Sequence, residues 1–212
     1  MTLATDWVTI SALATAAGTL VLALATFASV RSANRAARVA ERSLLAGLRP
    51  LLLPSRLEDS SQKVAFVEGK YIAVPGGMGV AECTDEAVYL AASLRNVGPG
   101  IAVLHGWRFY PERKIGSEQA PLEEFTLLSR DLYVPMGDVG FWQGAFRDPS
   151  TPEFAEARAV VAEHRDWSVD VLYGDAEGGQ RVISRYTMIP RDGGQWLANV
   201  GHHWNLDRDD PR

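Results

Sequence analysis

An uninterrupted apolar run near the N-terminus constrains this chain more than any other feature. Residues 7–30, WVTISALATAAGTLVLALATFASV, contain no charged side chain. An α-helix of this length spans about 36 Å, and the hydrocarbon core of a bilayer is about 30 Å thick. A buried helix of a soluble protein is usually shorter and is rarely apolar on all sides. The sequence therefore predicts a transmembrane helix over residues 7–30, with Trp7 at one interface and residues 1–6 as a short extracytoplasmic segment.

A cleavable signal peptide is the alternative to a retained helix. Ala23-Leu24-Ala25 has the small-x-small form of a cleavage site. A signal peptide also needs a basic N-terminal region, and MTLATDW contains no lysine or arginine. The apolar run is longer than the apolar region of a usual signal peptide, so a retained helix is favoured.

Four arginines follow the apolar run directly: Arg31, Arg35, Arg38 and Arg42. No lysine or arginine precedes them, so the positive-inside rule predicts a cytoplasmic C-terminal side and an outside N-terminus in a bacterial inner membrane. Their spacing of 4, 3 and 4 places all four on one helical stripe, where anionic lipid headgroups are the expected partner. Because proline is absent before Pro50, one helix is expected from about residue 7 to residue 48, with residues 31–49 as a basic juxtamembrane segment.

Small residues recur every four positions in the apolar run, as in the pairs Ser11 and Thr15, Ala14 and Gly18, and Ala12 and Ala16. This spacing allows close approach of helix backbones and is compatible with a homo-oligomer formed through the transmembrane helix. The alternative is that such residues are simply common in the membrane spans of GC-rich bacteria.

The remainder of the chain is acidic. Residues 57–212 contain 24 acidic and 15 basic side chains, a net charge of about −9. Binding to nucleic acid requires clustered lysine and arginine, so nucleic acid is not an expected partner. The single cysteine, Cys83, cannot form an intramolecular disulfide, which fits a reducing compartment.

After Pro50 the pattern changes from helical to strand-like. Residues 86–95 and 101–110 alternate apolar and polar side chains, and NVGPG at 96–100 is typical of a tight turn. These stretches predict a β-hairpin.

A second hairpin and several weaker strands complete a mainly β domain. Residues 167–173 and 180–189 are β-rich runs joined by GDAEGG. Weaker strands are expected at residues 51–56, 62–69, 124–130 and 139–146. Seven or eight short strands with frequent turns indicate an immunoglobulin-like β-sandwich over residues 50–204, although the Cys…Trp…Cys pattern of true immunoglobulin domains is absent.

One helix is expected between the strands. Ser150-Thr151-Pro152-Glu153 has the form of a capping box, and Phe154, Ala157 and Val161 give an apolar stripe. These residues predict a helix over 151–164. Residues 205–212 are polar and are expected to fray.

Four stretches carry a resemblance to a known group of proteins. They are Leu48-Arg49-Pro50 after the arginine-rich helix, LRNVGPGIAV (94–103), DLYVPMGDVGFWQG (131–144) and VLYGDAEGGQRVISRY (171–186). Together they resemble uncharacterised membrane-anchored proteins of actinobacteria, which have one N-terminal transmembrane helix and a C-terminal β-sandwich-like domain. The resemblance covers most of the chain and implies a topology. It implies no reaction and assigns no site residue.

The histidines are the first candidates for chemistry. His105 is predicted on the apolar face of a strand, where a hydrogen-bonded core role is favoured over that of a ligand or base. His164 is expected at the end of the predicted helix, where a cation suits the helix dipole. His202 and His203 are neighbours, so in a strand they would point to opposite faces and would not easily share a metal. Since the sequence contains no P-loop, nucleophile elbow or dinucleotide fingerprint, no catalytic residue, cofactor or metal site is predicted.

Three aromatic side chains form a candidate partner-binding patch. Tyr133, Phe141 and Trp142 surround Pro135 and Gly137 in a predicted loop. Exposed aromatic side chains beside proline and glycine can bind a partner. The alternative is that they cover the end of the core.

The sequence thus predicts a single-pass membrane-anchored protein whose cytoplasmic β-sandwich binds an unknown protein partner or its own copies, without catalysis. The first alternative is an exported envelope β-sandwich that binds a ligand or acts as an adhesin. The second is an enzyme or metalloprotein whose site assembles from distant strands, with His105, His202 and His203 as candidates.

Overall fold

The computed structural model describes residues 3–208, and the chain divides into two units, Met1–Gly47 and Leu48–Arg212. The first unit contains helix α1 (Leu3–Ala46), and the second is a β domain. Of the predicted N-terminal segment and polar tail, residues 1–2 and 209–212 lie outside the described residues.

Helix α1 is continuous over 44 residues, as the absence of proline predicts. Its stretch Asp6–Leu45 is long and apolar enough to cross a membrane, with a mean hydropathy of 2.0 in its most apolar part. The hydroxyls of Ser11, Thr15 and Thr19 each donate to a carbonyl three or four residues earlier, at 2.8–2.9 Å. These bonds satisfy polar groups inside the helix itself, which is what a hydrocarbon environment requires.

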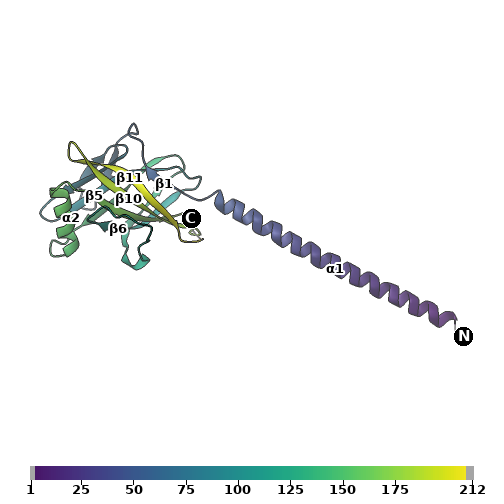
Figure 1. Ribbon diagram of the computed structural model, residues 1–212. Coiled ribbons are helices and arrows are strands. Elements are labelled where there is room, and N and C mark those ends of the chain that lie inside the picture. The colour runs from purple at the N-terminus through teal and green to yellow at the C-terminus, as the bar shows by residue number, and fades with distance from the viewer. Residues whose placement is uncertain (1–2, 209–212) are drawn as a thin grey trace. The chain divides into compact units, whose positions relative to one another are not determined.

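Eleven strands, one α-helix and one 3₁₀ turn make up the described part of the β domain (Figure 1). Their bounds are β1 (Leu52–Pro54), β2 (Gln62–Ala65), β3 (Tyr71–Val74), β4 (Met78–Cys83), β5 (Val88–Asn96), β6 (Ala102–Tyr110), η1 (Leu122–Glu124), β7 (Thr126–Val134), β8 (Val139–Phe146), α2 (Pro152–Ala162), β9 (Trp167–Gly174), β10 (Arg181–Arg191) and β11 (Gln195–Asn205).

Nine of the strands form one curled antiparallel sheet, and β2 and β3 form a separate hairpin. The order in the sheet is β1-β5-β4-β11-β10-β9-β6-β7, with β8 also paired to β5. Strand β8 pairs with Val88–Arg95 along one edge of β5, while β4 and β1 share the other edge. The two ends of the curled sheet are therefore β7 and β8, which are neighbours in the chain.

The sheet is covered on both faces. The main core contains Trp107, Trp142, Trp167 and Trp196 together with α2, and successive indole rings lie 5.6–6.4 Å apart. The β2–β3 hairpin packs against β4, β5 and β8, and residues 120–125 pack against β9–β11. Central strands are consequently buried on both sides, and every residue of β9 is buried.

The first predicted hairpin is wrong. Strand β5 pairs with β1, β4 and β8, whereas β6 pairs with β7 and β9, so the two strands do not pair with each other. The loop 96–100 carries the chain from one part of the curled sheet to another. Both strands are buried on both faces along most of their length, and local alternation does not specify a partner in that situation.

The other strand predictions have mixed outcomes. The hairpin of 167–173 and 180–189 is confirmed as β9 and β10, and strands are present in each of the four weaker stretches. Strands β3, β4 and β11 were not predicted, and β11 includes Asn205, the first residue of the expected tail. The mainly β class is confirmed, but one continuous sheet forms in place of two immunoglobulin-like sheets.

The predicted helix is present as α2, and hydrogen bonds at its two ends determine where it begins and where it stops. The hydroxyl of Thr151 accepts a hydrogen bond from the backbone N–H of Phe154 at 3.3 Å, so Thr151 is the N-cap. At the other end, the N–H groups of His164 and Arg165 donate to the carbonyls of Val161 and Val160. These two bonds form a Schellman motif, in which His164 has the left-handed φ of 49° usually adopted by glycine.

Candidate functional site

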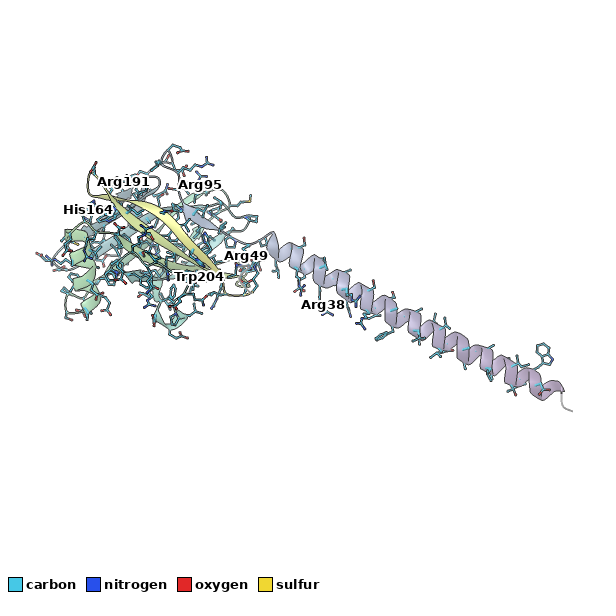
Figure 2. All side chains as sticks on the ribbon, viewed as in Figure 1. Arg38, Arg49, Arg95, His164, Arg191 and Trp204 are labelled. Carbon is cyan, nitrogen blue, oxygen red and sulfur yellow. The ribbon has the colours of Figure 1, made fainter. Side chains whose placement is uncertain are left out.

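The predicted membrane-interface residues lie along α1. Trp7 is 71% exposed, and Arg31, Arg35, Arg38 and Arg42 are exposed on a shared helix face together with Phe27 and Val39 (Figure 2 labels Arg38). An arginine-rich face next to an apolar span is suited to phosphate headgroups.

The segment that follows α1, Leu48–Pro54, is here called the exit segment. It is built into the β domain instead of forming a free linker. A Cβ atom at Gly100 would overlap the backbone carbonyl of Leu48, and one at Gly98 would lie 2.5 Å from the carbonyl oxygen of Arg49. Only glycine permits this approach, and neither glycine has a positive φ. The glycines of the NVGPG loop therefore serve close packing and not a tight turn.

Asn96 holds the same loop against the exit segment. Its side-chain oxygen accepts hydrogen bonds from the backbone N–H groups of Leu51 at 3.2 Å and Gly98 at 3.0 Å. Its side-chain nitrogen donates to the carbonyls of Gly100 at 2.6 Å and Val134 at 2.9 Å. An asparagine side chain can make four hydrogen bonds, so this fully buried side chain uses its whole capacity.

Two buried tyrosines hold Leu52. The backbone N–H of Leu52 donates to the Tyr173 hydroxyl at 3.2 Å, and the Tyr186 hydroxyl donates to the Leu52 carbonyl at 2.9 Å. Tyr173 also contacts the Ser184 hydroxyl at 2.9 Å, and Ser184 contacts Nδ1 of His203 at 2.5 Å. Burial raises the pKa of Tyr173 to about 12 and raises that of Tyr186 well above its ordinary value. Both hydroxyls therefore stay protonated at neutral pH.

Arg49 fixes the other end of the exit segment (Figure 2). Its guanidinium donates to Asn205 Oδ1 at 2.8 Å and forms an ion pair with Asp207 at 2.5 Å. Burial opposes the charged form of Asp207, but the hydrogen bonds from Arg49 and from the backbone of Arg181 lower its pKa below the ordinary value of 3.8. The first residues of the expected tail are thus ordered through this contact.

Four sequence stretches, 48–50, 94–103, 131–144 and 171–186, meet at the exit segment. Residues 48–50 are packed by the loop in 94–103, whose Asn96 also binds Val134 in the third stretch. The fourth stretch, 171–186, supplies Tyr173 and Tyr186. These stretches together build the attachment of the β domain to the chain that follows α1.

A second buried polar cluster lies on the outer face of β6, β9 and β10. Arg185 donates to both carboxylate oxygens of Asp170 at 2.7 Å, and the Tyr110 hydroxyl donates to the same carboxylate at 2.9 Å. The guanidinium lies between the rings of Tyr110 and Trp204, at 5.1 and 4.9 Å. Burial raises the pKa of Tyr110 to about 12.

The loop 111–121 closes over this cluster. The carbonyls of Gly116 and Glu118 accept longer hydrogen bonds from Arg185, at 3.4 and 3.3 Å, and Ser117 accepts one from the Trp204 indole at 2.9 Å. The sequence analysis did not predict this cluster: Arg185 lies inside a β-rich run, and its acidic partner lies on another strand and could not be identified from sequence.

The histidines lie in separate environments. His105 occupies a β-bulge in β6, because the ladders to β7 and β9 both shift between Leu104 and Gly106. The bulge leaves His105 half-buried instead of in the core, and burial together with the charge of Arg181 lowers its pKa. His164 contacts the Arg191 carbonyl at 2.9 Å and lies against Trp196 at 4.5 Å (Figure 2).

His202 and His203 point to opposite faces of β11, as predicted. His202 lies against the Trp204 ring at 4.2 Å, whereas His203 contacts Ser184. Among residues 3–208, no group of three or more His, Cys, Asp and Glu side chains is placed to hold a metal ion.

The predicted aromatic patch is wrong in one member. Trp142 is fully buried in the main core, so it cannot contact a partner. Phe141, its neighbour on β8, points to the other face and packs against the β2–β3 hairpin core. Tyr133 is 60% exposed near the end of β7. The alternation of β8, a strand that the sequence also predicts at 139–146, points Phe141 and Trp142 to opposite faces and separates these side chains.

Comparison with protein-family models and with curated proteins gives no match. A protein from Archaeoglobus fulgidus matches 60% of this chain and 93% of its own, with 11% identity and a TM-score of 0.25. A β-glucosidase from Kluyveromyces marxianus matches 62% of this chain but 13% of the β-glucosidase, with 13% identity and a TM-score of 0.22. Likenesses this weak carry no argument about function.

Proposed function

We propose that this chain is a single-pass membrane protein whose β domain is held at the cytoplasmic side and acts as a protein-interaction or scaffolding module. The observation that carries the proposal is the exit segment, in which the chain leaving an apolar helix is fixed in the β domain by glycine packing, Asn96, Tyr173 and Arg49. The exit segment belongs to the β domain itself, so the ordered domain begins at Leu48, directly after the unit that contains α1. A domain that starts this close to an apolar helix stays near the membrane surface, where it can meet a partner.

Orientation rests on the arginines that follow the apolar run, with none before it. Alkaline phosphatase fused after residue 212 should be inactive in cells, and a fluorescent protein fused at the same place should be bright. Active phosphatase, or a mature N-terminus near Thr26 found by mass spectrometry, would instead establish the exported alternative.

Self-association through α1 supports a scaffolding role. An uncharged stripe with alternating steps of three and four residues runs the length of the helix, with small or β-branched residues at all positions but the last: Thr9, Ala12, Ala16, Thr19, Ala23, Thr26, Val30, Ala33, Ala37, Ala40 and Leu44. The four arginines lie off this stripe. Two parallel copies could therefore meet along it without bringing their positive charges together.

The interaction role is tested by recovering partners of the tagged full-length protein from membranes in a mild detergent. A matched control replaces residues 7–30 with an unrelated transmembrane sequence. The proposal expects recovery of a stoichiometric partner or of further copies of the chain. If the β domain carries the contact, the control with the replaced transmembrane sequence should recover the same partner. Absence of any specific partner, even after cross-linking in intact cells, would contradict it.

A further inference from the structure

We propose that the seam between β7 and β8 binds an extended segment of a partner protein, with aliphatic side chains at alternate positions and an acidic side chain among them. This inference rests on the proposed interaction role and names the surface and the class of partner. Its starting point is that β7 and β8 end the curled sheet.

The two strands are joined by the short turn 135–138 but do not form a ladder. Strand β7 pairs with β6 and β8 pairs with β5, and neither has a further ladder partner among residues 3–208. Two strand edges therefore border the same seam with unpaired backbone groups. Such edges are the usual templates for strand addition by a peptide.

A small cleft lies in the seam, with a volume of about 70 Å³. The buried side chains of Phe66 and Trp107 contribute to its lining, and its walls are Thr126–Ser129 of β7 and Gln143–Ala145 of β8. Leu127, also in the lining, is 74% exposed. The cleft has room for about two waters, or for one short aliphatic side chain.

Close packing at one glycine and a bulge shape the two sides of the seam. Gly144 of β8 faces Trp107, and a Cβ atom there would lie 2.9 Å from the indole ring. In β7, residues 128–131 bulge out of the ladder, because Leu127 and Leu132 pair with Gly106 and Leu104 of β6. The bulge takes the middle of β7 out of regular register, so β7 presents an interrupted edge to the seam.

Charge selects the partner. The Arg130 side chain reaches from the bulge across the seam and donates to neutral acceptors, Gln143 Oε1 of β8 at 3.2 Å and the Ala65 carbonyl of β2 at 3.0 Å. It belongs to none of the ion pairs of the described residues. An exposed arginine without a carboxylate partner, in a body of net charge about −9, would attract an acidic side chain.

The chemistry of the segment follows from strand geometry. Side chains alternate between faces, so one face can place an aliphatic side chain in the cleft next to Leu127 and Trp107. An acidic residue near it reaches Arg130, and the backbone pairs with a free strand edge.

The test uses the full chain in nanodiscs and a display library of random seven-residue peptides as the probe. The inference expects enriched peptides to alternate aliphatic residues and to contain an acid. Binding should slow amide hydrogen exchange in residues 126–131 and 143–147. Absence of enrichment, or enriched peptides that protect another region, would overturn it.

Two variants and one control sharpen the result. Arg130→Glu and Ser129→Trp, both at exposed positions of the bulge, should each weaken binding by about tenfold or more, the first by charge repulsion and the second by covering the cleft. Arg113→Glu makes the same charge change on the exposed loop 111–121 and should bind as the unaltered chain does. If all three variants bound the peptides equally and kept their melting temperatures, the seam would not be the peptide-binding site.

Two further outcomes separate this inference from the proposed function. If a natural partner is recovered equally well by Arg130→Glu, the interaction role stands and the seam inference falls. If protection of the seam rises with protein concentration in the absence of peptide, the occupant is a second copy of the chain, and the proposed peptide class is wrong.

Discussion

At the residue scale, the strongest single constraint in the β domain is the pair of Asp170 and Arg185. The carboxylate is fully buried and the arginine is 2% exposed, so each charge depends on the other and on Tyr110. Burying two charges is costly, and removing one partner of such a pair is strongly destabilising because the other charge is left buried without compensation. Here it fixes β9 beside β10 and holds the loop 111–121 over both.

Asp170→Asn should destabilise the β domain by about 3–5 kcal/mol, because it leaves the Arg185 guanidinium buried without a counter-charge. Urea unfolding of the full chain in detergent, followed by tryptophan fluorescence, measures this loss. The control is Arg158→Gln, whose partner Asp85 is fully exposed, and it should have little effect. Equal effects of the two variants would contradict a special role for the buried pair.

The ion pair of Arg49 and Asp207 predicts a pH dependence. The pKa of Asp207 is lowered on folding, so its contribution to stability is present above the ordinary value of 3.8 and is lost as the pH falls through the folded value. Asp207→Asn should therefore reduce the loss of stability on acidification below pH 3.8. Melting temperatures measured between pH 3 and pH 7 test this, and curves that stay parallel over the whole range would show that Asp207 does not contribute.

Single residues were predictable from sequence where their neighbours in the chain set their environment. The opposite orientation of His202 and His203 follows from strand alternation alone, and the structure confirms it. His105 was not predictable, because its place depends on a bulge defined by two partner strands. The strand predicted at 139–146 already placed Trp142 on the opposite face from Phe141, but which of the two faces lies in the main core depends on distant strands.

At the scale of elements, the loop NVGPG correctly predicted a break between two strands but wrongly predicted that these strands form a hairpin. The sequence predicts a break between two strands, and a break occurs. Its two glycines, however, provide room for Leu48 and Arg49 of the exit segment, which are far away in sequence. The strands that β5 and β6 pair with depend on packing against both of their faces, and the local sequence of neither strand determines them.

Gly100→Ala should displace the exit segment, since its new methyl group would overlap the Leu48 carbonyl. We expect a loss of about 2 kcal/mol in the free energy of unfolding, together with faster amide exchange in residues 51–53. Gly179→Ala is the matched control, because its Cβ atom would lie 3.9 Å from Asp175 Oδ2, an ordinary contact. If Gly100→Ala and Gly179→Ala behaved alike, close packing of the exit segment would not be needed for stability.

Helices were the most predictable elements, because their signals are contained within them. The proline-free apolar and basic run predicts α1, and the capping-box form of 150–153 with the stripe of Phe154, Ala157 and Val161 predicts α2. The structure moves the N-cap to Thr151 and buries Val160 in place of Val161. Strand β11 was missed because its polar residues Asn199, His202 and His203 do not alternate regularly with apolar ones. Its partner β10, in ladder contact along its whole length, stabilises it.

At the scale of the whole molecule, α1 also predicts an assembly. In a Cys83→Ser background, cysteine placed at Ala33, Ala37 or Ala40 should form disulfide-linked dimers when isolated membranes are treated with a mild thiol oxidant, because these positions lie on the uncharged stripe. Ser32→Cys and Val39→Cys lie off the stripe and serve as controls. Dimer yields that are equal at all five positions, or absent at all, would contradict a parallel helix pair.

The mainly β class of the domain could be predicted from sequence, since short strands and frequent turns are local features. The continuous curled sheet could not, because it depends on long-range pairings such as β4 with β11 and β1 with β5. For the same reason, the sequence did not predict that the stretches around the exit segment pack together. Their packing depends on contacts between residues up to 158 positions apart.

The central claim is that α1 anchors the chain in a membrane with the β domain on the cytoplasmic side. The chain's single cysteine, Cys83, is exposed at the end of β4 and so provides a direct probe. A membrane-impermeant maleimide added to intact spheroplasts should leave Cys83 unlabelled, and permeabilisation should allow labelling. Asp6→Cys in a Cys83→Ser background should show the reverse, with labelling in intact spheroplasts. Labelling of Cys83 before permeabilisation would place the β domain outside and contradict the account.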